Sequence, residues 1–238
     1  MMRHKAEAII QKTRDDYNKI AGAFSGTRQH VAELMQFRPF LADGQSILDW
    51  GCGNGRLLYL LKDFDLHYFG VDQSRNLLKE AKKNPLLEFQ DAQFFCTAHK
   101  DKNFDDDFFD LVFMIASFHH LPDEKTRLKL LKKIFAEMKP GATLIMTNWN
   151  LESDWAKAKL KKDWDDVGDG DYFIPWKDQY GKELANRYYH HFEKDELKAL
   201  LEKAGFKIKS MYYSSGSLKV NKKEGKNLVS VAAKANGG

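Results

Sequence analysis

Residues 49–55 read DWGCGNG, and they stand between the apolar pair Ile47-Leu48 and a helix-forming run that starts at Leu57. Glycines at alternate positions let the backbone approach a ligand closely, and the following helix presents free N–H groups at its first turn. The G-x-G-x-G spacing differs from the G-x-G-x-x-G of dinucleotide sites, which must bind a pyrophosphate. Asp49 leads into the loop, and an acid there disfavours phosphate and favours a ligand with an amino group.

A second acid, Asp72, ends the next apolar run at residues 67–72. A carboxylate in that place can accept two hydrogen bonds from a ribose diol. The strand, the glycine loop, the helix and the second strand with its acid together predict that the chain binds S-adenosyl-L-methionine. A nucleotide site and a purely structural turn are the alternatives.

Strand and helix patterns alternate along the chain from Ser46 to Asn148. Strands are predicted at 47–50, 67–72, within 87–97, at 110–116 and at 142–147, and helices at 57–62, 73–83 and 123–138. The continuous apolar run at 110–116 is typical of a central parallel strand. This alternation predicts an α/β fold with a parallel sheet and helices on both faces.

The two ends of the chain follow other patterns. Apolar spacing predicts an N-terminal helical cap over 1–45, with a break at 23–28. Residues 151–192 are rich in aromatic side chains and predict an insertion or lid over one edge of the sheet, with a loop at 168–171. Residues 193–238 predict a helix that ends at Gly205 and a hairpin of strands at 206–213 and 228–233. We expect one domain over 1–238, with its core at 46–150.

Composition excludes several classes of protein. Of the 238 residues, 43% are hydrophobic and 30% charged, which excludes a disordered chain. The only two cysteines, Cys52 and Cys96, cannot build a disulfide framework or a four-cysteine zinc site, and we expect no metal. No apolar stretch approaches the about 20 residues of a membrane span, and no secretory leader is visible. We therefore expect a cytoplasmic protein without a membrane partner. The net charge of +4 permits a nucleic-acid partner without requiring one.

The loop DWGCGNG resembles motif I of the class I S-adenosylmethionine-dependent methyltransferases, and Asp72 matches their ribose-binding acid. The resemblance implies a Rossmann-like, doubly wound sheet of seven strands whose final strand is reversed. In that family the residue after the third strand contacts adenine; one register places Thr97-Ala98 there and another Asp91. The expected cofactor contacts are Asp49, Gly51, Cys52, Gly53, Asn54, Gly55, Asp72, Gln73, Thr97, Ala98 and Ala116.

Three further segments resemble the tRNA wobble-uridine carboxymethyl methyltransferases: YNKIAGAFSGTR at 17–28, IASFHHL at 115–121 and RYYHHF at 187–192. The resemblance implies esterification of a carboxylate on the uracil side arm, with tRNA as partner and, in some relatives, a small zinc-binding activator subunit. A carboxylate is ionised at pH 7 and needs no strong base, and an arginine fork can hold it. The candidate catalytic residues are Arg28, His119, Asn148, Arg187, Tyr188 and His190.

Two other functions stay open. One is methyl transfer to a small-molecule acceptor, with the aromatic insertion as a lid over the pocket. The other is a non-catalytic subunit that binds S-adenosylmethionine or RNA. A run of lysines between 203 and 226 either follows phosphates in a salt-dependent way or keeps the edge of a hairpin solvated.

Overall fold

The computed structural model describes residues 2–27, 31–89, 91–98 and 102–235. Its main element is an eight-stranded sheet in the order β10-β9-β11-β5-β4-β1-β2-β3. The strands are β1 (Ser46–Trp50), β2 (His67–Asp72), β3 (Asp91–Cys96), β4 (Phe109–Ile115), β5 (Met138–Trp149), β9 (Lys207–Ser215), β10 (Leu218–Val220) and β11 (Asn227–Ala233).

The sheet confirms the predicted topology. Strands β1 to β5 pair in parallel, whereas β11 lies between β5 and β9 and is antiparallel to both. The last strand is therefore the reversed one. The short β10 adds an eighth strand to the seven expected, because the lysine-rich connection folds back and pairs Val220 with Tyr213 of β9.

Helices cover both faces of this sheet, so the fold is a doubly wound α/β sheet. One apolar core joins the sheet to α4 (Glu124–Glu137) and α6 (Lys194–Lys203). The other joins it to η1 (Ala32–Phe40), α2 (Leu58–Leu61) and α3 (Arg75–Ala81). Within β1, Leu48 belongs to the first core and Ile47 to the second, which explains why two consecutive residues of the strand are apolar. Short 3-10 turns, η2 (Pro85–Phe89) and η3 (Phe118–His120), complete the connections.

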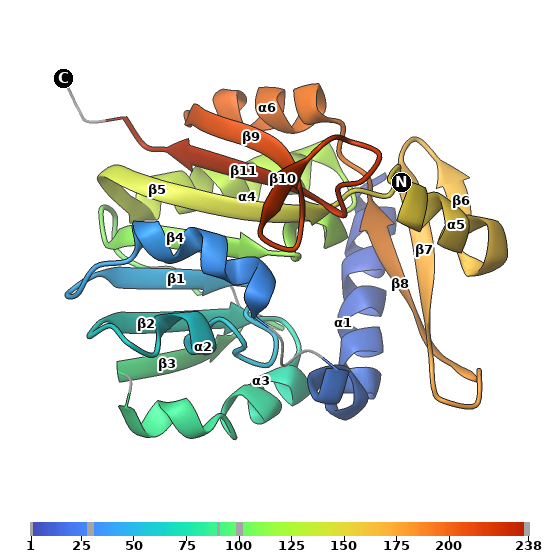
Figure 1. Ribbon diagram of the computed structural model, residues 1–238, viewed down its shortest axis with the longest axis horizontal. Helices are drawn as coiled ribbons and strands as arrows, with labels where there is room; N and C mark the ends of the chain where they lie inside the picture. Colours follow the sequence, from blue (N-terminus) through green and yellow to red (C-terminus); the bar gives the residue numbers. More distant parts are fainter. Residues whose placement is uncertain (1, 28–30, 90, 99–101, 236–238) are drawn as a thin grey trace.

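The N-terminal helix α1 (Met2–Thr27) runs across the carboxyl end of the large sheet, between that sheet and β8 (Figure 1). The helix continues to Thr27, so the break expected at 23–28 is its end. Asn18 fixes it to α3, because its Oδ1 accepts hydrogen bonds from Ser74 Oγ (2.8 Å) and from the Asn76 N–H (3.1 Å).

The segment after β5 forms α5 (Asp154–Asp163) and a separate antiparallel sheet of β6 (Asp165–Gly168), β7 (Asp171–Lys177) and β8 (Glu183–His190). The expected loop at 168–171 is the turn between β6 and β7, where Asp169 and Gly170 have φ of 53° and 77°. Two central residues with positive φ make the two-residue turn that matches strand twist. No helix in the described ranges has the length and hydropathy that a membrane span needs.

Candidate active site

A cavity of about 770 Å³ lies where β1, β2, β4 and β5 end, and α1 and β8 close its other side. Open α/β sheets bind ligands at the carboxyl ends of their parallel strands. The lining includes the expected residues Gly51, Cys52, Gly53, Asn54, Asp72, Gln73, Thr97, Ala116, His119 and Arg187. The sheet therefore brings most of the predicted cofactor contacts to one cavity.

The glycine loop forms one wall, and its backbone accepts only glycine at its start. Gly51 has φ +79°, and a Cβ there would lie 2.3 Å from Ser117 Cβ. Gly53 has φ +55° and faces open space, while its N–H donates to Asp72 Oδ2 at 2.9 Å. The loop thus gives a ligand direct access to backbone, as the amino-acid end of S-adenosylmethionine requires.

The two acids of the motif occupy different places. Asp72 lines the cavity, accepts a second hydrogen bond from the Ser74 N–H at 2.7 Å, and has its pKa raised to about 6 by burial. A carboxylate has further lone pairs, so Asp72 can also accept from a ribose hydroxyl. Asp49 does not line the cavity: it lies buried behind the loop, accepts from Tyr68 Oη at 2.8 Å, and burial raises its pKa to about 7. Its place fits support of the loop better than direct contact with an amino group.

The register of the third strand separates the two expectations for the adenine contact. β3 begins at Asp91, which pairs with His67 at the start of β2, and ends at Cys96 opposite Asp72. Asp91 therefore lies at the far end of the sheet, whereas Thr97 lies at the carboxyl end and lines the cavity. Two other expected contacts, Gly55 and Ala98, are not part of the lining.

Arg187 is the one expected catalytic arginine that the structure describes; Arg28 lies outside the described residues. The Arg187 side chain is 3% exposed and lines the cavity. The guanidinium lies over the rings of Tyr17, Trp176 and Tyr189, at 5.6, 5.2 and 5.3 Å from their centroids. Within the described ranges no carboxylate lies within ion-pair distance of it, and its Nε has no hydrogen-bond partner. The buried Asp16 carboxylate attracts the guanidinium from beyond that distance and is itself paired with Lys12 at 2.5 Å. A direct anionic partner of Arg187 can therefore come from a ligand in the cavity.

Tyr17 and His120 hold this guanidinium in place. Arg187 Nη1 donates to Tyr17 Oη at 3.4 Å. Tyr17 Oη lies 2.9 Å from His120 Nε2, and His120 Nδ1 lies 2.7 Å from the Tyr188 carbonyl oxygen. A carbonyl only accepts, so Nδ1 carries the proton and Nε2 accepts from the tyrosine. Burial lowers the pKa of His120 to about 3, so the ring stays neutral.

His119 is also a neutral donor. Its Nδ1 accepts from the Trp149 N–H at 3.2 Å, which leaves the proton on Nε2. That Nε2 atom is buried and has no hydrogen-bond partner. Burial lowers the pKa of His119 well below its ordinary value. The ring stacks on Tyr189 with centroids 4.9 Å apart.

Strand alternation turns three expected residues away from the cavity. On β8, Arg187 and Tyr189 line the cavity, whereas Tyr188 and His190 point to the other face of the strand. There Tyr188 Oη and His190 Nδ1 form hydrogen bonds with the Asp171 carboxylate, at 2.6 and 2.7 Å. Burial opposes protonation of His190, but its hydrogen bonds to Asp171 and Glu196 outweigh burial and raise its pKa.

On β5 the same period puts Thr147 and Trp149 on the cavity and Asn148 on the other face, fully buried. Tyr17, Trp149 and Tyr189 are among the lining residues that the sequence did not single out as site residues. The period of two along 187–190 is the signal that groups Tyr189 with Arg187.

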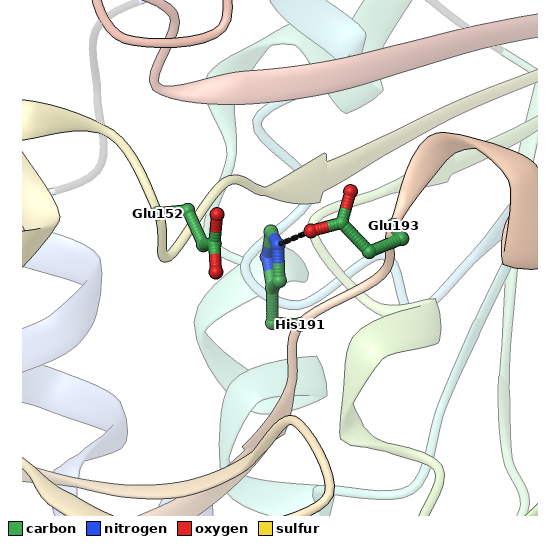
Figure 2. Close-up of side chains that lie close together, drawn as sticks. All are labelled: Glu152, His191 and Glu193. Carbon is green, nitrogen blue, oxygen red and sulfur yellow. Dashed lines mark hydrogen bonds and ion pairs between the residues drawn. The ribbon is translucent and has the colours of Figure 1, made fainter.

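A separate group of potential metal ligands lies outside the cavity. Glu152, His191 and Glu193 each offer one ligand atom, and these atoms lie within 4.8 Å of one another (Figure 2). The Lys222 ammonium forms ion pairs with both carboxylates, at 3.0 Å from Glu152 Oε2 and 2.7 Å from Glu193 Oε1. His191 Nδ1 accepts from the Leu151 N–H at 3.2 Å, and its Nε2 faces Glu193 at 3.3 Å. The arrangement is a lysine-centred ion-pair group that ties the insertion to the β9–β11 connection.

Comparison with known proteins agrees with this geometry. Residues 24–210 match the family model described as a methyltransferase domain. The chain is 29% identical over 211 residues to a tRNA (carboxymethyluridine(34)-5-O)-methyltransferase of Schizosaccharomyces pombe, covering 81% of this chain and 87% of that protein. A protein of the same name from Xenopus tropicalis is 32% identical over 61% of this chain, which spans only 22% of that relative. Phosphoethanolamine N-methyltransferase 1 of Zea mays is 28% identical over 62% of this chain, which spans 28% of that protein.

Solved structures show the same fold. A SAM-dependent methyltransferase from Methanosarcina mazei superposes with a TM-score of 0.67 at 23% identity, over 84% of this chain and 97% of that one. A chain from the Haloferax volcanii complex of the Trm112 methyltransferase activator with a methyltransferase superposes with a TM-score of 0.66 at 18% identity, over 95% and 99% of the two chains.

Proposed function

The chain belongs to the methyltransferase domain family, with S-adenosyl-L-methionine as its cofactor, and from that premise we propose that its acceptor is a carboxylate: the 5-carboxymethyl group of a wobble uridine in tRNA. One observation carries this proposal. The buried Arg187 guanidinium lines the cavity and forms no direct ion pair in the described part of the chain, and a planar carboxylate matches its fork.

S-adenosyl-L-methionine, which the glycine loop and Asp72 would hold, would supply an electrophilic methyl group to a carboxylate oxygen and leave as the neutral thioether. Arg187 orients the carboxylate through its planar fork, and each oxygen keeps a further lone pair that can accept the methyl group. The aromatic rings of Tyr17, Trp176 and Tyr189 exclude water from the guanidinium and strengthen its attraction for the carboxylate. No proton is transferred, so positioning is the main task.

The histidines favour a carboxylate over an amine acceptor. A protonated amine must lose a proton before it can accept a methyl group, and therefore needs a base. His120 Nε2 already accepts from Tyr17, and His119 Nδ1 accepts from the Trp149 N–H. Neither ring offers a free lone pair to the cavity. The arginine also fills the aromatic box that would otherwise suit an alkylammonium group.

Two comparisons bear on the choice of acceptor. The Schizosaccharomyces pombe relative, of which this chain covers 87%, is named for wobble carboxymethyluridine. The plant relatives named for phosphoethanolamine match at a similar identity over a smaller part of the chain. The match along nearly the whole fungal protein supports the tRNA acceptor, and the free Cys52 and Cys96 thiols fit a reducing cytoplasm.

Transfer of a labelled methyl group tests the proposal. The acceptors are tRNA that carries unmethylated 5-carboxymethyluridine, the same tRNA without the side arm, and phosphoethanolamine. Each assay is run with and without a Trm112-type activator subunit, which we propose as a partner. The expected product is an alkali-labile uridine methyl ester, seen by mass spectrometry after digestion to nucleosides. Label on phosphoethanolamine alone would refute the carboxylate acceptor.

A further inference from the structure

An exposed tryptophan stands where the cavity opens to solvent. Trp155, in the first turn of α5, is 38% exposed and also lines the cavity, so it marks the rim. Its indole meets Trp149 and Trp164 edge to face, with centroids 6.0 and 5.8 Å away and interplanar angles of 82° and 74°. Two edge contacts fix the orientation of the ring while leaving much of its surface open. An indole held in this way is a stacking platform.

A lysine accompanies that indole. Lys226 is exposed, lines the same rim, and places its Nζ 5.6 Å from the Trp155 centroid. Its backbone is fixed at both ends, because its N–H donates to the Ser214 carbonyl and its carbonyl accepts from the Asn150 N–H, both at 2.8 Å. Among the residues that the structure describes, no carboxylate lies within ion-pair distance of its ammonium. The ammonium is thus available to an external anion.

Positive charge continues outward from this rim. Helix α5 reads DWAKAKLKKD, and its four lysines, at 157, 159, 161 and 162, are all exposed. Of the two acids in this helix, Asp163 forms an ion pair with Lys177 Nζ at 2.5 Å, and Asp154 immediately precedes Trp155 in the chain. Lys159 and Lys162 follow Trp155 by four and seven positions and share its side of the helix, whereas Lys157 and Lys161 lie on the opposite side. Lysines beside an aromatic platform are an arrangement with which proteins bind single-stranded nucleic acid.

We propose that Trp155 and Lys226 form a nucleotide subsite at the rim of the cavity, which binds the residue adjacent to the one that enters. The neighbouring base stacks on the Trp155 indole. The Lys226 ammonium, on its flexible stem, leaves the ring and contacts the connecting phosphate. The ligand class is single-stranded RNA. The inference rests on the proposed function, since it places the loop nucleotide next to the modified uridine.

Binding of a fluorescein-labelled single-stranded RNA oligonucleotide, measured by fluorescence anisotropy over a range of salt concentrations, tests the subsite without turnover. The variants are Trp155→Ala, Trp155→Phe and Lys226→Ala. The matched controls are Tyr180→Ala, an aromatic residue 85% exposed outside the cavity lining, and Lys207→Ala, at the opposite end of β9 from the rim. Affinity for S-adenosylmethionine serves as the folding check for every variant.

Trp155→Ala is expected to weaken RNA binding about tenfold, and Trp155→Phe by much less because an aromatic face remains. Lys226→Ala is expected to lower the slope of log K against log salt by about 0.7, the share of one phosphate contact on a single strand. Both control variants are expected to bind as the wild type does.

Three results would overturn the subsite. The first is RNA binding by Trp155→Ala equal to that of Tyr180→Ala. The second is a salt slope of Lys226→Ala equal to that of Lys207→Ala. The third is an equal loss by Trp155→Ala in methylation of the free nucleoside 5-carboxymethyluridine and of tRNA, which would make Trp155 part of the acceptor pocket. Failure of the proposed function is distinct, because it abolishes ester formation in the wild type and leaves the binding measurement intact.

Discussion

Replacing Arg187 with methionine separates a receptor for the acceptor from a support for the fold. Methionine keeps much of the apolar stem and removes the charge and the fork. Truncating one partner of a buried, hydrogen-bonded charge pair costs about 2–5 kcal/mol, which corresponds to a loss of about 30-fold to 4,000-fold. We expect that loss in kcat/KM for the carboxylate acceptor, while the Kd of S-adenosylmethionine stays unchanged because the glycine loop and Asp72 do not contact Arg187.

The free energy of unfolding of the same variant is expected to change little. Burying the guanidinium costs several kcal/mol after relaxation, and the three ring contacts return up to about 2 kcal/mol each. These contributions nearly cancel, so Arg187→Met is expected to change the free energy of unfolding by less than about 2 kcal/mol. For a chain of 238 residues that is a Tm shift below about 8 °C, of either sign.

The assay combines calorimetric titration of S-adenosylmethionine, thermal unfolding and steady-state methylation of tRNA. Arg187→Lys is the companion variant, because it keeps the charge without the bidentate fork, and an intermediate activity is expected. A large fall in Tm, or a parallel loss of cofactor affinity, would refute the reasoning and make Arg187 a structural residue. Unchanged kcat/KM in Arg187→Met would equally contradict its role as the acceptor receptor.

Three further outcomes follow from the geometry of the site. Gly51→Ala is expected to destabilise the fold and abolish cofactor binding in thermal-shift assays, because its Cβ would lie 2.3 Å from Ser117 Cβ. The Cβ of Gly53→Ala would meet no atom within 4 Å, so this variant carries only the positive-φ strain of about 1–2 kcal/mol. Tyr17→Phe keeps the ring under the guanidinium but removes the hydroxyl between Arg187 and His120. The expected result is about a fivefold to tenfold lower kcat/KM for the acceptor with an unchanged Kd for the cofactor. Equal losses in acceptor kcat/KM and in cofactor affinity would contradict this prediction. Asp72 must be ionised to accept from ribose hydroxyls, and burial raises its pKa to about 6. Cofactor affinity measured by titration is therefore expected to be flat above pH 7 and to fall about tenfold per pH unit well below pH 6. Asp72→Asn should remove that dependence on pH.

Short-range features of the sequence were sufficient for the cofactor half of the site. The strand into DWGCGNG, the glycines that need positive φ, and the acid at the end of the next strand are all local, and each element forms where its pattern predicts. Parallel strands bring their carboxyl ends together whatever lies between them, so the alternation of strands and helices already places Gly51, Asp72 and Ala116 beside one cavity.

The acceptor half was less accessible to sequence reasoning. Tyr188 and His190 stand beside Arg187 in the chain, and their residue types suit catalysis equally well. A strand sends neighbours to opposite faces, so the period of two groups Arg187 with Tyr189 and Tyr188 with His190. The period does not say which pair faces the ligand. That choice depends on how β8 packs against α1, a contact between segments about 170 residues apart.

The sequence by itself determined the alternation of strands and helices and the chemistry of the cofactor loop, because these depend on local periodicity and turn geometry. The reversed last strand was implied by the family resemblance. Only the tertiary structure decided which acids and arginines reach the cavity. Asp49 lies behind the loop and Asp72 within reach of a ligand, although both end parallel strands. Long-range packing also placed Tyr17 against Arg187 and Trp155 at the rim. Burial, charge and exposure of a side chain are set by what other segments bring to it, and no short stretch of sequence contains that information.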